Sequence, residues 1–156
     1  MAEVFRGSSL ASIEDTGRFK LPGIFKDLID AQLGEGARFF ITSQDGKRAQ
    51  IYPIREWEER EALLATLPMS SPVRIKFQKM VAYYGAPAVM DKQGRIQLAP
   101  VLRNEANLKG EVVVLGMAGK LEPGYLEVMN HEMFKEEMKA KPFTEEDLAA
   151  LAALGM

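Results

Sequence analysis

Two stretches of this chain carry the same short pattern: IEDTGRFKLPGIFKDL at residues 13–28 and MDKQGRIQLAPVLRNEANL at residues 90–108. Both place an acid three residues before a Gly-Arg pair, then alternate polar and apolar residues up to a proline. Aligned without a gap, the equivalent pairs are Glu14 and Asp91, Gly17 and Gly94, Arg18 and Arg95, Leu21 and Leu98, and Lys26 and Arg103. Only the proline shifts, by one position. The shared order indicates an internal duplication.

Each copy is predicted to fold as strand, turn, strand, short helix, strand, strand. Residues 18–21 and 95–98 alternate as half-buried strands do, and each follows a turn glycine. An amphipathic stretch after each proline indicates a short helix opened by that proline. The further strands are expected at residues 37–43 and 49–54 in the first copy, and 111–117 and 120–128 in the second.

Helices are expected between and after the two copies. Residues 55–67 and 73–85 have apolar residues at helical spacing and predict an antiparallel helix pair. Trp57 is expected in a core or interface, and at least one of Tyr83 and Tyr84 in the core. Near the end of the chain, Thr144 followed by Asp147 predicts an N-cap for a last, acidic helix.

These patterns predict an α+β fold made of two tandem hairpin modules with flanking helices. The first module spans residues 8–56, a helical linker spans 57–86, the second module spans 87–130, and an acidic helical tail spans 131–156.

The composition is that of a globular protein. Hydrophobic residues make up 47% of the chain and charged residues 27%, which argues against disorder. No apolar run reaches the roughly 18 residues of a membrane-spanning helix, and the first residues lack a secretory signal pattern. We therefore expect a cytoplasmic protein without a membrane partner. Zero cysteines exclude disulfides and thiolate chemistry.

The charges are unevenly distributed along the chain. The net charge is −2, but residues 122–156 carry a net charge of −5 and the rest of the chain a net charge of +3. Nucleic acids attract lysine and arginine through their phosphates. A body this weakly basic binds DNA tightly only if several modules act together.

An enzyme is the weakest class of interpretation. The one histidine, His131, stands beside Glu132 in an acidic, helix-like stretch at residues 127–138 and has no partner nucleophile. A phosphate-binding glycine loop and an HExxH metal pattern are both absent from the sequence. We expect no catalytic residue, no metal, no cofactor and no small-molecule substrate.

The repeated acid and arginine suit DNA recognition. An arginine can contact guanine O6 and N7 with two hydrogen bonds, and a carboxylate four residues upstream can orient it across a glycine turn. The same spacing suits an internal salt bridge that only staples the turn, and spacing alone leaves both readings open. Nearby cations could contact phosphates and position the protein: Arg6, Lys20, Lys26 and Arg103. On sequence alone, the last three are better explained as ordinary solvated surface residues.

Further motifs link the two copies to a known family. FRG at residues 5–7, IYPIREWEE at 51–59, VVVLG at 112–116 and GKLE at 119–122 stand in order around the two loops. Over roughly residues 4–130 the chain resembles the MraZ family of bacterial transcriptional regulators. It differs in having Glu14 where the family usually has Asp, in the sequence after GKLE, and in an acidic tail beyond about Lys141 that is expected to have no counterpart in the family.

The resemblance implies a swapped-hairpin barrel of the SpoVT-AbrB type, a ring-shaped homo-oligomer and association with the nucleoid. It also implies repression of the division and cell-wall gene cluster through direct repeats in upstream double-stranded DNA. The candidate DNA-binding residues are then Glu14, Gly17, Arg18, Asp91, Gly94 and Arg95, with Lys20 and Arg6 beside them.

Two other functions are compatible with the same module. Hairpins of the AbrB type also occur in MazE-like antitoxins that neutralise a protein toxin, although these usually carry one module and a toxin-binding tail. A purely structural ring is the other alternative. A gel shift with DNA from upstream of the protein's own gene distinguishes the regulator from both.

Overall fold

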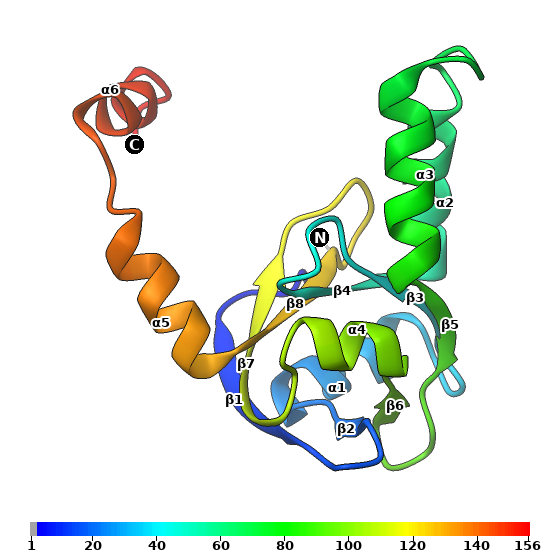
Figure 1. Ribbon diagram of the computed structural model, residues 1–156. Helices are drawn as coiled ribbons and strands as arrows, with labels where there is room; N and C mark the ends of the chain where they lie inside the picture. Colours follow the sequence, from blue (N-terminus) through cyan, green and yellow to red (C-terminus); the bar gives the residue numbers. More distant parts are fainter. Residues whose placement is uncertain (1–2) are drawn as a thin grey trace.

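The computed structural model describes residues 3–156, which form eight strands and six helices (Figure 1). The strands are β1 (Ser8–Ile13), β2 (Arg18–Lys20), β3 (Arg38–Thr42), β4 (Ala49–Pro53), β5 (Ala86–Val89), β6 (Arg95–Gln97), β7 (Gly110–Met117) and β8 (Tyr125–Asn130). The helices are α1 (Gly23–Gln32), α2 (Ile54–Leu64), α3 (Pro72–Tyr84), α4 (Pro100–Glu105), α5 (His131–Ala140) and α6 (Glu145–Ala153). The order strand, strand, helix, strand, strand, helix occurs twice, as the duplication predicts.

All eight strands belong to one antiparallel sheet, in the order β5-β3-β4-β8-β7-β1-β2-β6. The two outer strands, β5 and β6, follow each other in the chain and lie close together, so the sheet curls into a nearly closed barrel (Figure 1). Strands and helices together make the fold α+β, which confirms the prediction.

The two copies are interleaved within this barrel. Strand β1 of the first copy pairs with β7 of the second, and β5 of the second copy pairs with β3 of the first. Equivalent strands also meet each other, because β2 pairs with β6 and β4 pairs with β8. Each copy therefore supplies strands that complete the other, in a pseudo-twofold arrangement.

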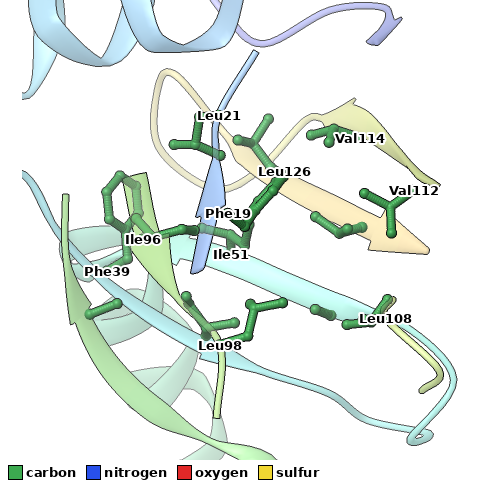
Figure 2. Close-up of a cluster of buried hydrophobic side chains, with 14 of the residues drawn as sticks. Phe19, Leu21, Phe39, Ile51, Ile96, Leu98, Leu108, Val112, Val114 and Leu126 are labelled. Carbon is green, nitrogen blue, oxygen red and sulfur yellow. The ribbon is translucent and has the colours of Figure 1, made fainter. Parts of the chain in front are cut away.

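Apolar and polar residues alternate along the strands, and the apolar ones form one core inside the barrel. Phe19 of β2 lies opposite Ile96 of β6, and the two side chains are only 0% and 2% exposed. Figure 2 shows them packed with Leu21, Leu98 and buried side chains of the other strands. Full burial of such a side chain contributes roughly 1.5–3 kcal/mol. Because neighbouring residues on a strand point to opposite faces, this packing turns residues 18, 20, 95 and 97 outward.

The linker forms a helical hairpin, which projects from one side of the barrel (Figure 1). Trp57 of α2 is buried and stacks on Phe40, with the ring centroids 4.8 Å apart. Tyr84 of α3 is 7% exposed whereas Tyr83 is 59% exposed, so one tyrosine of the pair joins the core as expected. Helices α2 and α3 lie side by side, and a groove of about 680 Å³ is lined by both.

The strand expected at residues 120–128 begins later than predicted. Residues 118–124 form a turn, and β8 starts at Tyr125. The carboxylate of Glu56, 1% exposed, accepts the backbone N–H groups of Lys120 at 3.0 Å and Leu121 at 2.8 Å. Pro123 has no N–H to donate to a ladder. A buried carboxylate and a proline thus replace strand pairing here.

Beyond the barrel the chain ends in two helices. Residues 127–130 of the stretch expected to be helical continue β8, and α5 begins only at His131. The predicted cap of α6 is confirmed, since the Thr144 and Asp147 side chains each accept the other's backbone N–H. Helix α6 lies at the far end of α5, well away from the α2–α3 hairpin (Figure 1). Across residues 3–156, the helices are all too short or too polar to cross a membrane.

Candidate nucleic-acid interface

The two Gly-Arg loops have the same backbone structure. In the first, the N–H of Glu14 donates to the carbonyl of Arg18 at 3.0 Å, and the N–H of Gly17 donates to the carbonyl of Glu14 at 2.8 Å. The second loop repeats both bonds at 3.0 Å with Asp91, Gly94 and Arg95. The loops join β1 to β2 and β5 to β6, so the pairing of β2 with β6 brings them to one part of the barrel.

Both loop glycines have a backbone conformation that other residues adopt only with strain. Gly17 has φ +86° and Gly94 has φ +81°. A side chain would also have to displace a neighbouring one: a Cβ on Gly17 would lie 2.7 Å from Nη1 of Arg103, and one on Gly94 2.6 Å from Cδ of Lys26. Two features therefore favour glycine in each loop: the positive φ of the turn, and the close approach of a side chain from a helix.

Each loop is held by the other copy. The N–H of Leu21 donates to the carbonyl of Gly94 at 2.9 Å, and the N–H of Leu98 donates to the carbonyl of Gly17 at 3.0 Å. Arg103 adds a bond from Nη1 to the carbonyl of Asp15 at 2.7 Å, and Gln97 one from Nε2 to the carbonyl of Thr16 at 2.6 Å. The two loops consequently form one unit.

The acid and the arginine are joined in the second loop. Oδ2 of Asp91 lies 3.0 Å from Nε of Arg95, and Oδ1 accepts the backbone N–H groups of Gln93 and Arg95, both at 2.9 Å. The hydrogen bond from the Arg95 backbone is the main reason why the pKa of Asp91 lies below its ordinary value. The Arg95 side chain is still 34% exposed. Asp91 therefore orients an arginine that solvent can reach.

The first loop lacks this contact. Within residues 3–156, Glu14 makes no ion pair with Arg18, and both side chains are exposed. The N–H of Arg18 lies 3.4 Å from Oγ1 of Thr16, a long contact in the place where Asp91 receives the N–H of Arg95. The longer Glu14 side chain extends into solvent while the backbone keeps the shape of the second loop.

Three cations gather on the outer face of the β2–β6 ribbon: Arg18, Lys20 and Arg95, which we term the basic ribbon. Lys20 lies directly opposite Arg95 in the pairing register, and Arg18 lies two residues before Lys20 on the same face. Because Phe19 and Ile96 are buried in the core behind them, packing fixes the face of the ribbon from which these cations project.

The other candidate cations are placed differently. Arg6 is exposed but precedes β1, and at about 3.3 Å per residue it lies roughly 20 Å along the strand from the loop. Lys26 forms an ion pair with Asp30 at 2.6 Å, and Arg103 donates a hydrogen bond to the carbonyl of Asp15. The structure thus gathers Arg18, Lys20 and Arg95 but leaves Arg6 apart.

Gln97 and Arg103 have roles that sequence reasoning missed. Both residues belong to the second copy and donate hydrogen bonds to the first loop. The one sequence signal for this role was the alignment of Arg103 with Lys26, because Lys26 packs against Gly94 in the equivalent way. His131, the lone histidine, is the first residue of α5, and its Nδ1 lies 2.6 Å from a carboxylate oxygen of Glu111 in β7. Within residues 3–156, no group of three or more His, Cys, Asp or Glu side chains is arranged to hold a metal ion.

Comparisons with known proteins agree on one family. Residues 85–152 match the family model described as "MraZ protein, putative antitoxin-like". The match extends past Lys141, so the expectation that the tail has no counterpart in the family was wrong. The chain is 48% identical to the transcriptional regulator MraZ of Acidobacterium capsulatum, over 98% of this chain and 100% of the relative. It is 42% identical to that of Koribacter versatilis over the same shares, and 30% identical to that of Escherichia coli K12 over 94% of this chain and 95% of the relative. On this likeness, which covers nearly the whole length of each protein, the chain belongs to the MraZ family.

Proposed function

We propose that this protein is a DNA-binding transcriptional regulator and that the basic ribbon is its DNA-contacting surface. The observation that carries the proposal is the placement of Arg18, Lys20 and Arg95 on one solvent face of a two-stranded ribbon. The major groove of B-DNA admits a two-stranded ribbon, and an arginine is well suited to guanine edges there. The relatives named above are called transcriptional regulators, which supports the same conclusion.

The two arginines would act differently. Arg95 has Nε occupied by Asp91, so its outer edge meets DNA in a preset direction. Arg18 is not held in this way and adjusts to the bases or phosphates that it meets. Lys20 between them would contact phosphate, together with Arg6 further along the surface. Glu14, Asp91, Gly17 and Gly94 would shape and orient the loops.

Tight binding requires more than one ribbon. Three cations on a chain of net charge −2 give a weak electrostatic attraction to DNA. We therefore propose a ring-shaped homo-oligomer that engages direct repeats upstream of its target genes, with several subunits bound at once. The target is the division and cell-wall gene cluster, which the protein represses in the cytoplasm at the nucleoid.

The decisive experiment is a binding titration with DNA from upstream of the protein's own gene. We expect a shift of the repeat-containing fragment and none of a fragment with scrambled repeats, at the same salt concentration. The affinity should fall steeply as salt rises, since phosphate contacts release counterions. Equal binding of the two fragments would contradict sequence recognition, and no binding of either would refute the regulator.

An antitoxin is the second candidate, and the family model's description as antitoxin-like favours it. In that case the exposed C-terminal helices would bind a protein toxin. The neighbouring genes discriminate: division and peptidoglycan genes directly downstream support the regulator, whereas a small toxin gene supports the antitoxin. A protein that rescues growth from that toxin but ignores its upstream DNA would belong to the second class.

A further inference from the structure

The last 26 residues form an arm, residues 131–156, whose second helix buries none of its residues against the rest of the described chain, residues 3–156. Helix α6 reads EEDLAALAA, three acids followed by leucine and alanine, and none of its residues is buried. Leu148 is 53% exposed, and Phe143 and Leu154, on either side of the helix, are 72% and 75% exposed. A nine-residue helix is shorter than the roughly 12–15 residues that an isolated helix needs in water. Its apolar side therefore requires a cover.

A matching apolar surface is open elsewhere on the molecule. The groove of about 680 Å³ between α2 and α3, which we term the hairpin groove, is as large as a small-molecule site. Its larger apolar lining residues are Phe40, Ile54, Trp57, Leu64, Phe77 and Val81. Charged and amide side chains line its rest: Arg38, Glu58, Glu61, Arg74 and Gln78. Apolar residues at the hairpin's end are exposed too, with Met69 at 81% and Val73 at 68%. The groove suits the leucine and alanine face of a helix.

The charges on the α3 side of the hairpin groove are complementary to those of α6, whereas the α2 side carries Glu58 and Glu61. Helix α3 carries Arg74, Lys76 and Lys79 and no acid, and Arg74 borders the groove. The first turn of α6 carries Glu145, Glu146 and Asp147. Opposite charges across an interface fix the orientation of a bound segment. The acidic turn should face α3, which leaves the uncharged remainder of α6 for the apolar floor.

The arm cannot reach its own groove in the conformation that the barrel imposes. Helix α5 is anchored where it begins, by Asn130 as its N-cap, and along its length, where Nη2 of Arg48 lies 2.9 Å from both carboxylate oxygens of Glu137. These contacts direct α5 away from the barrel, so that α6 and the hairpin lie on opposite sides of the molecule (Figure 1). The occupant must come from another molecule.

We propose that α6 of one chain docks in the hairpin groove of a second copy of this chain. Donor and acceptor surfaces differ, so the contact is head-to-tail, and such contacts close into rings when the rotation permits. This inference rests on the proposed ring assembly and assigns its interface. It predicts that each subunit inserts its own α6 in the hairpin groove of one neighbour and binds the α6 of the other neighbour in its own groove.

Cross-linking tests the contact directly, because the chain has no cysteine of its own. Two differently tagged full-length chains are produced together, one with Ala149→Cys or Ala152→Cys in α6, the other with Gln78→Cys or Ala82→Cys, which border the groove. We expect a disulfide-linked heterodimer under mild oxidation from at least one of the four pairs. Gln44→Cys, exposed in the turn between β3 and β4, replaces the groove cysteine in the control and should give no link.

Charge reversal provides an independent measurement. Glu145→Lys, Glu146→Lys and Asp147→Lys together should raise the concentration at which the oligomer dissociates by at least about tenfold, since like charges would then face each other. Combining them with Arg74→Glu, Lys76→Glu and Lys79→Glu in the same chain should restore much of the loss. A reversal in α6 that the α3 changes do not rescue would count against the pairing.

The outcomes separate this inference from the proposals on which it rests. A large oligomer without any of the four cross-links overturns the docking and leaves the ring in place. A link that the Gln44→Cys control forms equally well overturns it too, and a monomeric protein removes ring and docking together. Operator binding, measured on the same samples, reports on the basic ribbon only where the oligomer is intact, because tight binding requires several ribbons.

Discussion

Oδ2 of Asp91 lies 3.0 Å from Nε of Arg95, whereas Glu14, in the equivalent place of the first copy, makes no ion pair with Arg18 within residues 3–156. The backbones of the two loops make the same hydrogen bonds, so the difference lies in the side chains. One methylene group separates the two acids. The duplicated loop thus exists in two forms, one with a braced arginine and one with an adjustable arginine.

Replacing Asp91 should therefore have a larger effect than replacing Glu14. Asp91→Asn keeps the size of the side chain and one oxygen that can accept the two backbone N–H groups, but it removes the charge and the Oδ2 acceptor that orient Arg95. We expect a lower melting temperature and weaker operator binding at neutral pH. Glu14→Gln is the matched control and should melt as the unchanged protein does. Thermal melts and binding titrations of both variants measure the difference.

The effect of Asp91→Asn on stability should depend on pH. The folded protein holds the pKa of Asp91 below its ordinary value, so the carboxylate stabilises the fold above its unfolded pKa of about 3.9. The stabilisation is lost as the pH falls through the lower, folded pKa. Melting temperatures of the two proteins should converge in acid. A gap that stays constant from neutral pH to below pH ~3 would show that the charge of Asp91 is not its cause.

Gly17 tests the requirement for a left-handed backbone at the loop. Gly17→Ala meets a positive φ of +86° and neighbours as near as 2.7 Å, and we expect it to destabilise the protein by about 1–3 kcal/mol. Gly23→Ala, at the start of α1 with no heavy atom within 4 Å of the new Cβ, is the control. It should leave the unfolding free energy unchanged or raise it. Chemical denaturation of both variants gives the comparison.

Local patterns predicted much of the fold. The proline-opened helices α1 and α4, the cap of α6 by Thr144, and the burial of Trp57 all follow from residues close together in the sequence. The repeat also indicated which elements would correspond. Local periodicity and turn chemistry suffice for such features because the contacts that decide them are short-range.

Long-range contacts account for what the sequence did not predict. The late start of β8 depends on Glu56, which is 64 residues from Lys120 in the chain. Within the candidate site, the bracing of the first loop by Arg103 spans 88 residues, and the pairing of Lys20 with Arg95 depends on the register between copies. The spacing of residues within one copy cannot predict these contacts between distant parts of the chain. They are determined by how the two copies pair with each other.

The two halves should not fold apart, because each copy's strands are completed by the other. A fragment of residues 1–67 lacks β7 beside β1, and a fragment of residues 68–156 lacks β3 beside β5. We expect each to be unfolded or aggregated alone, and the two to form a folded complex when produced together. A well-dispersed NMR spectrum from either fragment by itself would refute the interdependence of the copies.

The strongest prediction for function concerns Arg18 and Arg95. Arg18 is exposed and lies on the outer face of β2, so Arg18→Ala should leave the oligomer and its melting temperature nearly unchanged while operator binding is lost. Losing one base-reading arginine costs about 1–3 kcal/mol per contact, and a ring presents that loss at every engaged subunit.

Arg95→Ala should weaken operator binding less, because Nε of Arg95 is already occupied by Asp91 and only 34% of the side chain is exposed. It should melt earlier, since Asp91 loses its partner. Arg55→Ala, at an exposed site on α2, is the control for the loss of one positive charge and should change neither property by much. Salt-titrated binding curves paired with thermal melts separate the three variants. Undiminished operator affinity in Arg18→Ala would remove this arginine from the DNA interface, whereas a fall in affinity that only tracks the folded fraction would make it a structural residue.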